Sequence, residues 1–311
     1  MTAAELYTVA TTRGAIIDLS ARARWQLSGA DRVRYLNGQV TRDVKKLAPG
    51  KLSQACVLDV KGRLCGDVWI SAGADFLRLD AEGSLRDSLG LRLERYIIAD
   101  DAVLEDVTES TRHLHLLAPA SGDAMALLLE TAQWLESYRF GIRGFDRFCT
   151  TSEAEAILSQ LTPALPRLEA GGEVLESIRL ERGLPRWEAE LKPETLPAEA
   201  GLDATAIDFA KGCYLGQEIV SRIKSVGHVN RSLSGFISCD HEPLAPGESL
   251  FADANAERES ATITSVGWSF ALSRPIALGY LRRGTAGPLL HTRAPGQAAR
   301  EVEIRPLPFV P

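Results

Sequence analysis

The chain has 311 residues, of which 45% are hydrophobic and 24% charged, and its formal net charge at pH 7 is -6. This composition is typical of a soluble globular protein, and the length predicts two or three domains rather than a single core. The negative charge, the lack of a dense Lys/Arg block and the lack of a long apolar run argue against nucleic acid as the main partner and against a membrane-spanning segment.

The compartment that the sequence predicts is a reducing cytoplasm. The five cysteines are odd in number and widely scattered, which argues against a disulfide framework. Residues 1–13 lack the basic and apolar regions of a signal peptide, and they contain the acidic residue Glu5, which is atypical of a transit peptide.

The first half of the chain mixes strand and helix patterns. Alternating or β-branched residues predict strands at 15–19, 24–27, 53–58, 64–70, 76–79, 102–107, 113–117 and 141–149. Apolar residues at helical spacing predict helices at 33–47, 85–96, 122–132, 152–161 and 174–182. The segment 59–62 predicts a hairpin turn, and Ser152 with Glu155 predicts a capping box.

Two pairs of residues in these strands allow more than one interpretation. Depending on register, Cys56 and Cys65 face each other across the hairpin, and we expect core residues rather than a redox pair, which would need a specific geometry. His113 and His115 share one strand face at a spacing that can bind a metal. Because no third ligand lies nearby in the sequence, we expect paired surface histidines and no metal site.

The second half of the chain changes character twice. Residues 184–205 carry three prolines without a clear period, which predicts a long functional loop or a wrap between domains. After residue 227, Gly and Pro turns separate short strand patterns at 232–239, 249–251, 262–268, 276–280, 289–292 and 301–304. This pattern predicts an all-β barrel or sandwich that follows an α+β body, with domains at 1–226 and 227–311.

The segment 211–218, Lys-Gly-Cys-Tyr-Leu-Gly-Gln-Glu, joins the body to the β region through a predicted helix. Cys213 would lie just before the positive end of that helix, two residues from Lys211, and both features favour the thiolate. We therefore interpret Cys213 as an activated thiol. The alternative is a structural turn whose cysteine is a small buried apolar group.

This segment, continued by Arg222, Gly227 and Arg231, resembles the signature of the YgfZ-type folate-binding proteins. These are relatives of the glycine-cleavage T-protein, an aminomethyltransferase, and of iron–sulfur cluster assembly and repair factors. Further pieces resemble the family in the right order, at 27–31, 39–44, 177–185, 197–202, 276–280 and 302–309. The resemblance implies an α+β, T-protein-like folate-binding body with a C-terminal antiparallel β-barrel, and tetrahydrofolate in a central channel.

The resemblance also implies candidate ligand contacts. Arg179 matches a folate-contacting arginine, although an ion pair with Glu176 on the same helix face would explain it equally simply. Tyr214 would stack on a ligand ring or pack in the core. The first helical turn holds Gln217 and Glu218, of which Glu218 also complements the helix dipole. Arg222 would pair with Glu218 or face the folate tail.

The sequence departs from the transferase pattern at the acidic residues. T-proteins carry paired aspartates where this chain has only Asp67, and an acid that holds the pterin where this chain has Ile142. A hydrophobic side chain there would leave pterin donors unpaired. These departures favour the YgfZ branch over aminomethyl transfer.

Three functions compete on this basis. The first is a tetrahydrofolate-binding accessory protein for iron–sulfur cluster assembly or repair, with Cys213 as its functional thiol and Lys211 as the group that activates it. A single cysteine cannot hold a cluster, so iron–sulfur proteins or assembly factors would be partners. The alternative is a folate-dependent one-carbon transferase in which Asp67 acts as acid or base. The third is a folate sensor without catalysis.

Overall fold

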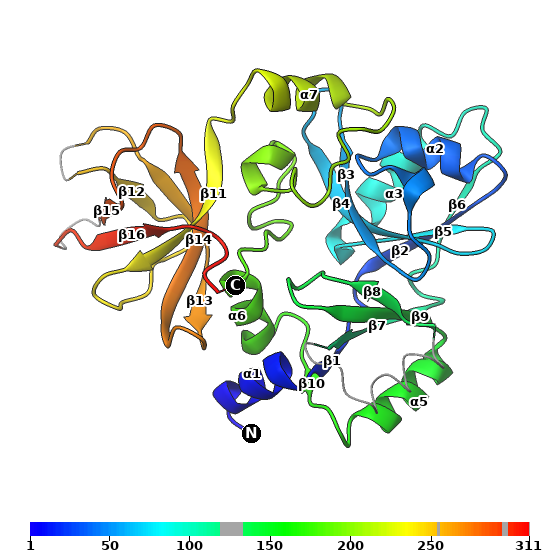
Figure 1. Ribbon diagram of the computed structural model, residues 1–311, viewed down its shortest axis with the longest axis horizontal. Helices are drawn as coiled ribbons and strands as arrows, with labels where there is room; N and C mark the ends of the chain where they lie inside the picture. The colour runs from blue at the N-terminus through cyan, green and yellow to red at the C-terminus, as the bar shows by residue number, and fades with distance from the viewer. Residues whose placement is uncertain (119–132, 254–255, 294–297, 311) are drawn as a thin grey trace.

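The computed structural model describes residues 1–118, 133–253, 256–293 and 298–310. The helix predicted at 122–132 lies outside these residues. Figure 1 shows a six-stranded barrel at one end, two mixed layers of sheet and helix at the other, and α6 between them. The predicted α+β class with a C-terminal barrel is confirmed.

The first sheet is antiparallel and has the order β3-β4-β5-β2-β6. Its strands are β2 (Ala23–Ser28), β3 (Ser53–Leu58), β4 (Leu64–Ala72), β5 (Leu77–Ala81) and β6 (Val103–Asp106). Apolar residues of α2 (Arg32–Gln39) and α3 (Arg86–Glu94) pack on it around Trp25 and Ile70. The pattern predicted as one helix at 33–47 ends at Gln39, and a short 3-10 turn, η1 (Val44–Lys46), follows.

The hairpin β3–β4 confirms the turn predicted at 59–62 and brings it against the segment that carries Cys213. Gly62 has a φ of 73°, and a Cβ there would lie 2.9 Å from the side chain of Ile219, so this approach requires glycine. Cys56 pairs with Asp67 rather than with Cys65, so the two cysteines do not face each other across the hairpin.

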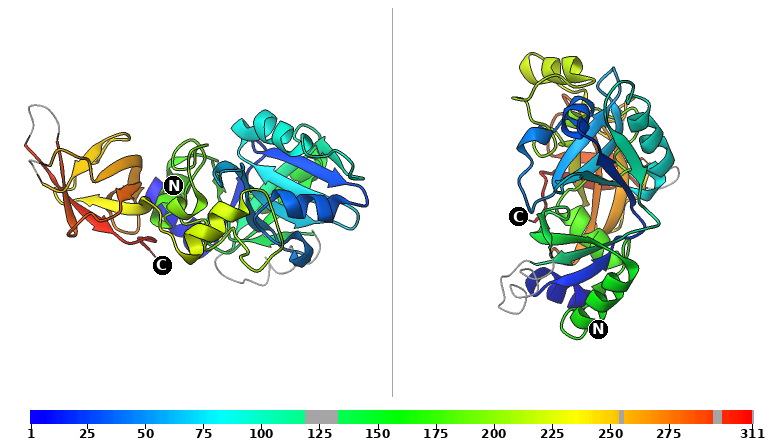
Figure 2. Two further views of the ribbon diagram at one scale, coloured as in Figure 1. Left: turned by 90° about the horizontal axis from the view of Figure 1, so that it is seen from above. Right: turned by 90° about the vertical axis from the view of Figure 1, so that its right-hand side faces the viewer.

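The second sheet has the order β10-β1-β7-β9-β8, and only its β1–β10 pair is parallel. Its strands are β1 (Ala15–Asp18), β7 (Arg112–Leu117), β8 (Leu135–Ser137), β9 (Gly144–Cys149) and β10 (Arg167–Leu168). Apolar residues pack α5 (Thr151–Leu161) on one face, and α1 (Ala3–Thr12) and α6 (Glu173–Glu181) on the other (Figure 1). Seen from above, the two sheets lie at the opposite end of the molecule from the barrel (Figure 2).

The capping box predicted for α5 is wrong by two residues. The spacing of Thr/Ser and Glu occurs twice in this stretch, at Thr150–Glu153 and at Ser152–Glu155. Because β9 ends at Cys149, the helix begins at once, and Thr150 forms the box with Glu153.

The barrel closes in the order β11-β14-β13-β12-β15-β16, with antiparallel pairs throughout, so the sequence alternative of a sandwich is wrong. Its strands are β11 (Arg231–Ser238), β12 (Ser249–Phe251), β13 (Ala261–Ser269), β14 (Arg274–Arg282), β15 (Leu289–Thr292) and β16 (Glu301–Arg305). Strand β13 has a register shift between Ile263 and Ser265. Whether the chain divides into independent domains at residue 226 stays a prediction.

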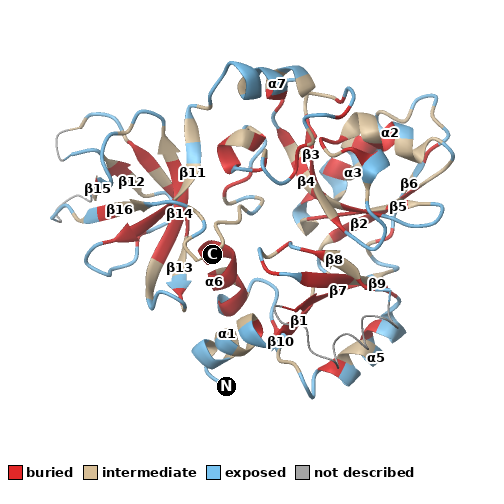
Figure 3. Cartoon of the chain, viewed as in Figure 1, coloured by how far each residue is buried: buried red, intermediate tan, exposed pale blue. Residues whose placement is uncertain are grey.

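Two connections hold the barrel to the sheets. The long segment after α6 includes a 3-10 turn, η3 (Pro197–Ala200), and leads to α7 (Gln217–Ser225), which lies mostly exposed between the barrel and the first sheet (Figure 3). After β16 the chain returns to α6, where the Phe309 N–H donates to the Glu181 carbonyl at 2.8 Å. In the part of the chain that the structure describes, no helix is both long and apolar enough for a transmembrane span.

Candidate functional site

A cavity of about 1110 Å³ lies where the two sheets, α6 and the segment after it meet the barrel. Its aromatic walls come from Trp69, Tyr138, Phe140 and Trp187. Six arginines and three acidic residues also line it: Arg22, Arg42, Arg139, Arg179, Arg182, Arg186, Asp67, Glu82 and Glu176. The cavity therefore combines stacking surfaces with an excess of cationic groups, a combination that suits a flat ring system with an anionic tail.

Arg179 lines this cavity from the last turn of α6. Its guanidinium binds both carboxylate oxygens of Glu176, with N–O distances of 2.7 and 2.9 Å. It also donates to Glu190 at 3.0 Å and to the Leu184 carbonyl at 2.7 Å. The ion pair with Glu176, one of the two interpretations of Arg179 from the sequence, is thus present. Glu190 is a second partner that the sequence did not indicate. The guanidinium is fixed in the cavity wall, where a role in ligand binding stays a prediction.

Asp67 is half-buried on β4 and also lines the cavity. The Gln54 amide donates to it at 3.2 Å, and the Thr205 hydroxyl donates to the Gln54 amide oxygen at 3.2 Å, which fixes the amide orientation. Burial raises the pKa of Asp67, although the positive charge of Arg22 opposes this effect. Asp67 is therefore poised to exchange a proton or to pair with ligand donors, and these roles stay predictions.

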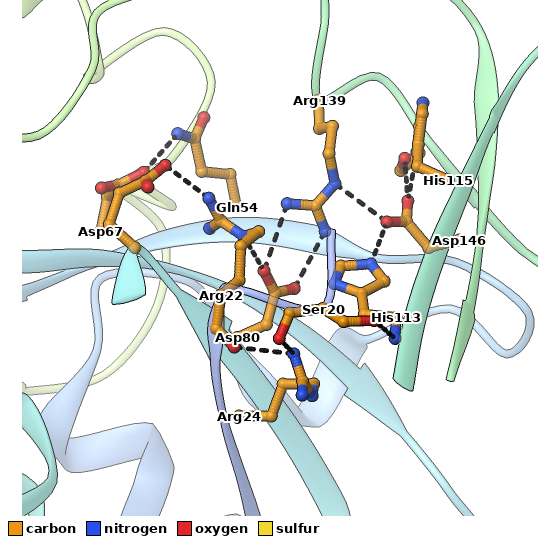
Figure 4. A network of polar contacts seen from close by, with 12 residues as sticks. Ser20, Arg22, Arg24, Gln54, Asp67, Asp80, His113, His115, Arg139 and Asp146 are labelled. Carbon is orange, nitrogen blue, oxygen red and sulfur yellow. Dashed lines mark hydrogen bonds and ion pairs between the residues drawn. The ribbon is translucent and has the colours of Figure 1, made fainter. Parts of the chain in front are cut away.

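A chain of buried charges that includes Arg22 and Arg139 of the cavity wall joins the two sheets (Figure 4). Arg139 donates to both oxygens of Asp80 on β5, at 2.9 and 3.2 Å, and to Asp146 on β9 at 2.9 Å. Burial alone would raise the pKa of Asp80, but Arg139 and Arg22 outweigh it and lower that pKa to about 2. For Asp146 too, Arg139 and His115 outweigh burial, and its pKa lies well below the ordinary value.

The expectation of surface histidines at 113 and 115 is wrong. Both side chains are fully buried on one face of β7 and bind Asp146, His113 at 2.6 Å and His115 at 3.1 Å. Burial lowers the pKa of His113 to about 4, so its ring is neutral at pH 7. The carboxylate that they share comes from a neighbouring strand, which no local spacing could reveal. Among the residues that the structure describes, no group of three or more His, Cys, Asp or Glu is placed to hold a metal ion.

Lys211 is buried, and its ammonium group is occupied by the chain around the end of α2. Nζ donates to the carbonyls of Asn37 and Val40 at 2.6 Å and of Arg42 at 3.0 Å, and it lies 4.9 Å from the centroid of the Tyr214 ring. Burial lowers the pKa of Lys211 to about 8. All three ammonium donors are therefore taken by backbone carbonyls, and the role of Lys211 in activating Cys213 stays a prediction.

Cys213 is exposed, in a loop four residues before α7, so its burial in a structural turn is excluded. Tyr214 is buried in the core that covers the β3–β4 hairpin, which supports packing over stacking. Arg222 donates to Glu218 at 2.9 Å on the exposed side of α7, as one of the sequence readings expected. The apolar side chains of α7 and its cap are covered only in part, since Val220 is buried but Val226, the C-cap residue, is 84% exposed.

The structure therefore divides the predicted site residues into two groups. The cavity wall contains Asp67 and Arg179. The remaining predicted residues belong to the segment 211–222 and are not among the residues that line the cavity: Lys211, Cys213, Tyr214, Gln217, Glu218 and Arg222. A contact between this second group and a ligand stays a prediction.

Comparisons with known proteins agree with this architecture. Residues 1–162 match the family of the GCVT N-terminal domain. The chain is 26% identical over 239 residues to "Iron-sulfur cluster assembly factor IBA57 homolog, mitochondrial" of Phaeosphaeria nodorum, a match that covers 74% of this chain and 57% of that protein. It is 26% identical over 253 residues to "tRNA-modifying protein YgfZ" of Yersinia pestis and 28% identical to that of Cronobacter sakazakii, with 76% of this chain and 74% of each relative covered.

The crystal structure of glycine cleavage system aminomethyltransferase T from Bartonella henselae superposes with a TM-score of 0.83. The match covers 99% of this chain and 89% of that chain at 19% identity. At this level of identity the likeness concerns the fold, and it confirms the predicted T-protein-like body with its C-terminal barrel.

Proposed function

Since the chain belongs to the GCVT N-terminal domain family, in its YgfZ-type branch, we propose that it is a cytoplasmic tetrahydrofolate-binding accessory protein for iron–sulfur cluster assembly or repair. The cavity is the proposed folate site, and Cys213 is the proposed functional thiol. The observation that carries the proposal is the cavity itself, whose size and mixture of aromatic, cationic and acidic walls suit a folate.

The donors and acceptors of the cavity match the parts of the ligand. A pterin presents a flat ring, which would stack on the indole of Trp69, and a row of N–H donors, which would bind the carboxylate of Asp67. The two residues lie two positions apart on β4 and therefore on the same face of the strand. A glutamate tail is anionic and suits Arg179 or Arg186. Small-molecule pockets span roughly 300–1,000 Å³, so the cavity has room for the whole ligand.

Ile142, which stands where the transferase carries a pterin-holding acid, is buried in the apolar cluster between α6 and the second sheet. It supplies no acceptor, so Asp67 with Gln54 would take over the pterin edge in this chain. This substitution supports a folate site whose pose differs from that of the transferase.

Folate binding is tested by titrating the purified protein with tetrahydrofolate in a calorimeter and by following its melting temperature. A ligand that binds only the folded state raises the Tm. Arg179→Lys keeps the charge but not the fork geometry, and it should reduce the shift. Arg86→Lys is the matched control, because Arg86 also bridges two carboxylates but lies outside the cavity wall. Absence of any Tm shift for the unmodified protein would refute the folate site.

The thiol role is tested in a strain that lacks this protein and has low iron–sulfur enzyme activities. Cys213→Ser should fail to restore them, whereas Cys239→Ser, at a second exposed cysteine, should restore them fully. Full restoration by Cys213→Ser would show that the mechanism does not depend on this thiol.

Aminomethyl or one-carbon transfer is the alternative for the same cavity, with Asp67 as its single acid. An assay with tetrahydrofolate and aminomethylated carrier protein, read out as ammonia release, tests it. Turnover that Asp67→Asn abolishes would favour the transferase and overturn the accessory role.

The bacterial relatives are named for tRNA modification, but the net charge of -6 does not favour direct RNA binding by this chain. We therefore propose that any link to tRNA passes through a protein partner.

A further inference from the structure

Glu190 lies in the segment after α6 and is 1% exposed, yet it does not line the cavity. One carboxylate oxygen accepts hydrogen bonds from Arg179 and from the Arg186 N–H, both at 3.0 Å. The other oxygen accepts from two barrel hydroxyls, those of Thr264 at 2.7 Å and Ser265 at 2.6 Å. A single buried carboxylate thus has one oxygen bound to two residues of the cavity wall and the other bound to the barrel.

The backbone of β13 is shaped for this contact. Successive side chains of a regular strand point to opposite faces, so Thr264 and Ser265 could not normally reach the same atom. The register shift between Ile263 and Ser265 breaks the alternation at this position, and both hydroxyls converge on one oxygen. The Tyr280 hydroxyl of the neighbouring strand β14 adds a hydrogen bond of 2.8 Å to the Glu190 carbonyl.

We propose that Glu190 is a positioning residue that couples the cavity to the barrel, holding Arg179 in place for the ligand only while β13 is docked. The inference rests on the proposed folate site and adds to it a connection between ligand affinity and the position of the barrel. Loss of the shorter of the two barrel hydrogen bonds, the one from Ser265, leaves that carboxylate oxygen with Thr264 as its remaining donor, so Glu190 shifts and its bond to Arg179 is weakened.

The same strand offers a matched control. Ser265 and Ser269 are both buried on β13, and each hydroxyl donates to a buried glutamate at 2.6 Å, Ser265 to Glu190 and Ser269 to Glu181. Neither serine lines the cavity. Only the glutamate that Ser265 binds also contacts Arg179, since Glu181 pairs with Tyr7 and with the Ala271 N–H.

The experiment compares Ser265→Ala with Ser269→Ala by calorimetric titration with tetrahydrofolate and by melting without ligand. Both variants lose one hydrogen bond to a buried carboxylate and should melt at similarly lowered temperatures. Ser265→Ala should raise the Kd about tenfold, whereas Ser269→Ala should change it less than about twofold. Equal effects of the two variants on the Kd would overturn the coupling.

A double-variant cycle tests the route through Arg179. If Ser265 acts through Glu190 and Arg179, the effect of Ser265→Ala on the Kd should largely disappear in the Arg179→Lys background. Additive effects would show that Ser265 acts by another route, which contradicts the proposal.

A ligand-free measurement separates this inference from the folate proposal. Arg179→Met should accelerate hydrogen exchange at the amides of β13 around Ser265, and Arg86→Met should not, because the coupling runs in both directions. If tetrahydrofolate does not bind, only the folate proposal fails, and accelerated exchange still supports the coupling. Unchanged exchange at β13 in Arg179→Met would refute the coupling whatever the ligand.

Discussion

The Nζ atom of Lys211 lies 2.6 Å from the carbonyl oxygen of Val40, the C-cap residue that follows α2. Two further carbonyls, those of Asn37 and Arg42, accept from the same ammonium. Lys211 thus fixes the cysteine-containing segment to the first sheet layer. Although Lys211 lies two residues from Cys213 in the sequence, its ammonium group is hydrogen-bonded to the chain around the end of α2.

Lys211→Met should lower the free energy of unfolding by about 2–3 kcal/mol, because three carbonyls lose a charged donor. Lys211→Arg should recover little of this loss, since a planar guanidinium cannot direct three donors in the manner of an ammonium. Urea unfolding measures both. If Lys211→Met instead keeps full stability but slows alkylation of Cys213, Lys211 acts on the thiol, as the sequence alone suggested.

Asp67→Asn should change stability in a pH-dependent way. Burial raises the pKa of Asp67 in the folded state above 3.8, its value in the unfolded chain. The contribution of Asp67 to the free energy of unfolding is therefore fully present below pH 3.8 and is lost as the pH rises through the raised pKa. The asparagine variant lacks this loss and should be more stable than the unmodified protein at pH 7. Melting curves between pH 4 and pH 8 measure the difference, and a less stable variant at pH 7 would contradict the assignment.

The same substitution should reduce tetrahydrofolate affinity about tenfold, because Asn cannot offer a charged acceptor to the pterin donors. Gln54→Glu provides a counter-test at the neighbouring position, since it places a second carboxylate beside Asp67 and raises its pKa further. As the pH falls, Asp67 takes up a proton and the affinity for tetrahydrofolate is lost. In Gln54→Glu this loss should begin at a higher pH than in the unmodified protein.

Arg139→Leu should destabilise the protein by about 3–5 kcal/mol, because it leaves two buried carboxylates without their shared cation. Arg86→Leu is the control: its two carboxylates are solvent-accessible, and the expected loss is about 0–1 kcal/mol. Guanidinium unfolding at neutral pH compares the two. Losses of equal size would mean that the buried network contributes no more than a surface ion pair.

The network also sets the response to acid. The pKa of Asp80 is lowered from 3.8 to about 2 in the folded state. Its contribution to the free energy of unfolding is therefore fully present above pH 3.8 and is lost as the pH falls through 2. In Arg139→Leu the remaining carboxyls take up protons more readily, and acid unfolding should move to a higher pH. Circular dichroism during acid titration follows this shift.

Tetrahydrofolate should not protect Cys213 from alkylation, because this exposed residue is not part of the cavity wall. Iodoacetamide labelling followed by peptide mass spectrometry should show the same Cys213 rate with and without ligand. Cys239, also exposed, serves as the accessible control, and buried Cys56, whose pKa burial raises, as the unreactive one. Strong protection of Cys213 alone would place the ligand against the cysteine segment.

Strands whose bounds are set by residues adjacent in the sequence were predictable. The hairpin strand Ser53–Leu58 and the barrel strands Ser249–Phe251 and Leu289–Thr292 have the predicted bounds, because alternation and turn residues are local signals. Where two local signals competed, as in the two possible capping boxes before α5, the choice depended on where β9 ends.

The candidate site was predictable only in part, since its side chains take partners from distant segments. Lys211 was identified by its motif, but its carbonyl partners lie more than 160 residues earlier in the chain. His113 and His115 gave a metal-like spacing without revealing that Asp146 would join them in the core. Asp80 and Glu190 belong to no motif, and only the packing of the sheets and barrel shows what they do.

Glu181 joins four regions of the chain. Its side chain accepts from Tyr7 of the first helix at 2.5 Å and from Ser269 of the barrel at 2.6 Å, while its carbonyl accepts from Phe309. During synthesis on the ribosome, this junction cannot form until residue 309 has emerged. The contact between Tyr7 and Glu181 needs only residues made earlier, so the side of α6 that faces α1 and the second sheet can be covered first. The side of α6 that carries Leu180 stays uncovered until the barrel strands have been synthesised, and it is the surface that an unfinished chain exposes to chaperones.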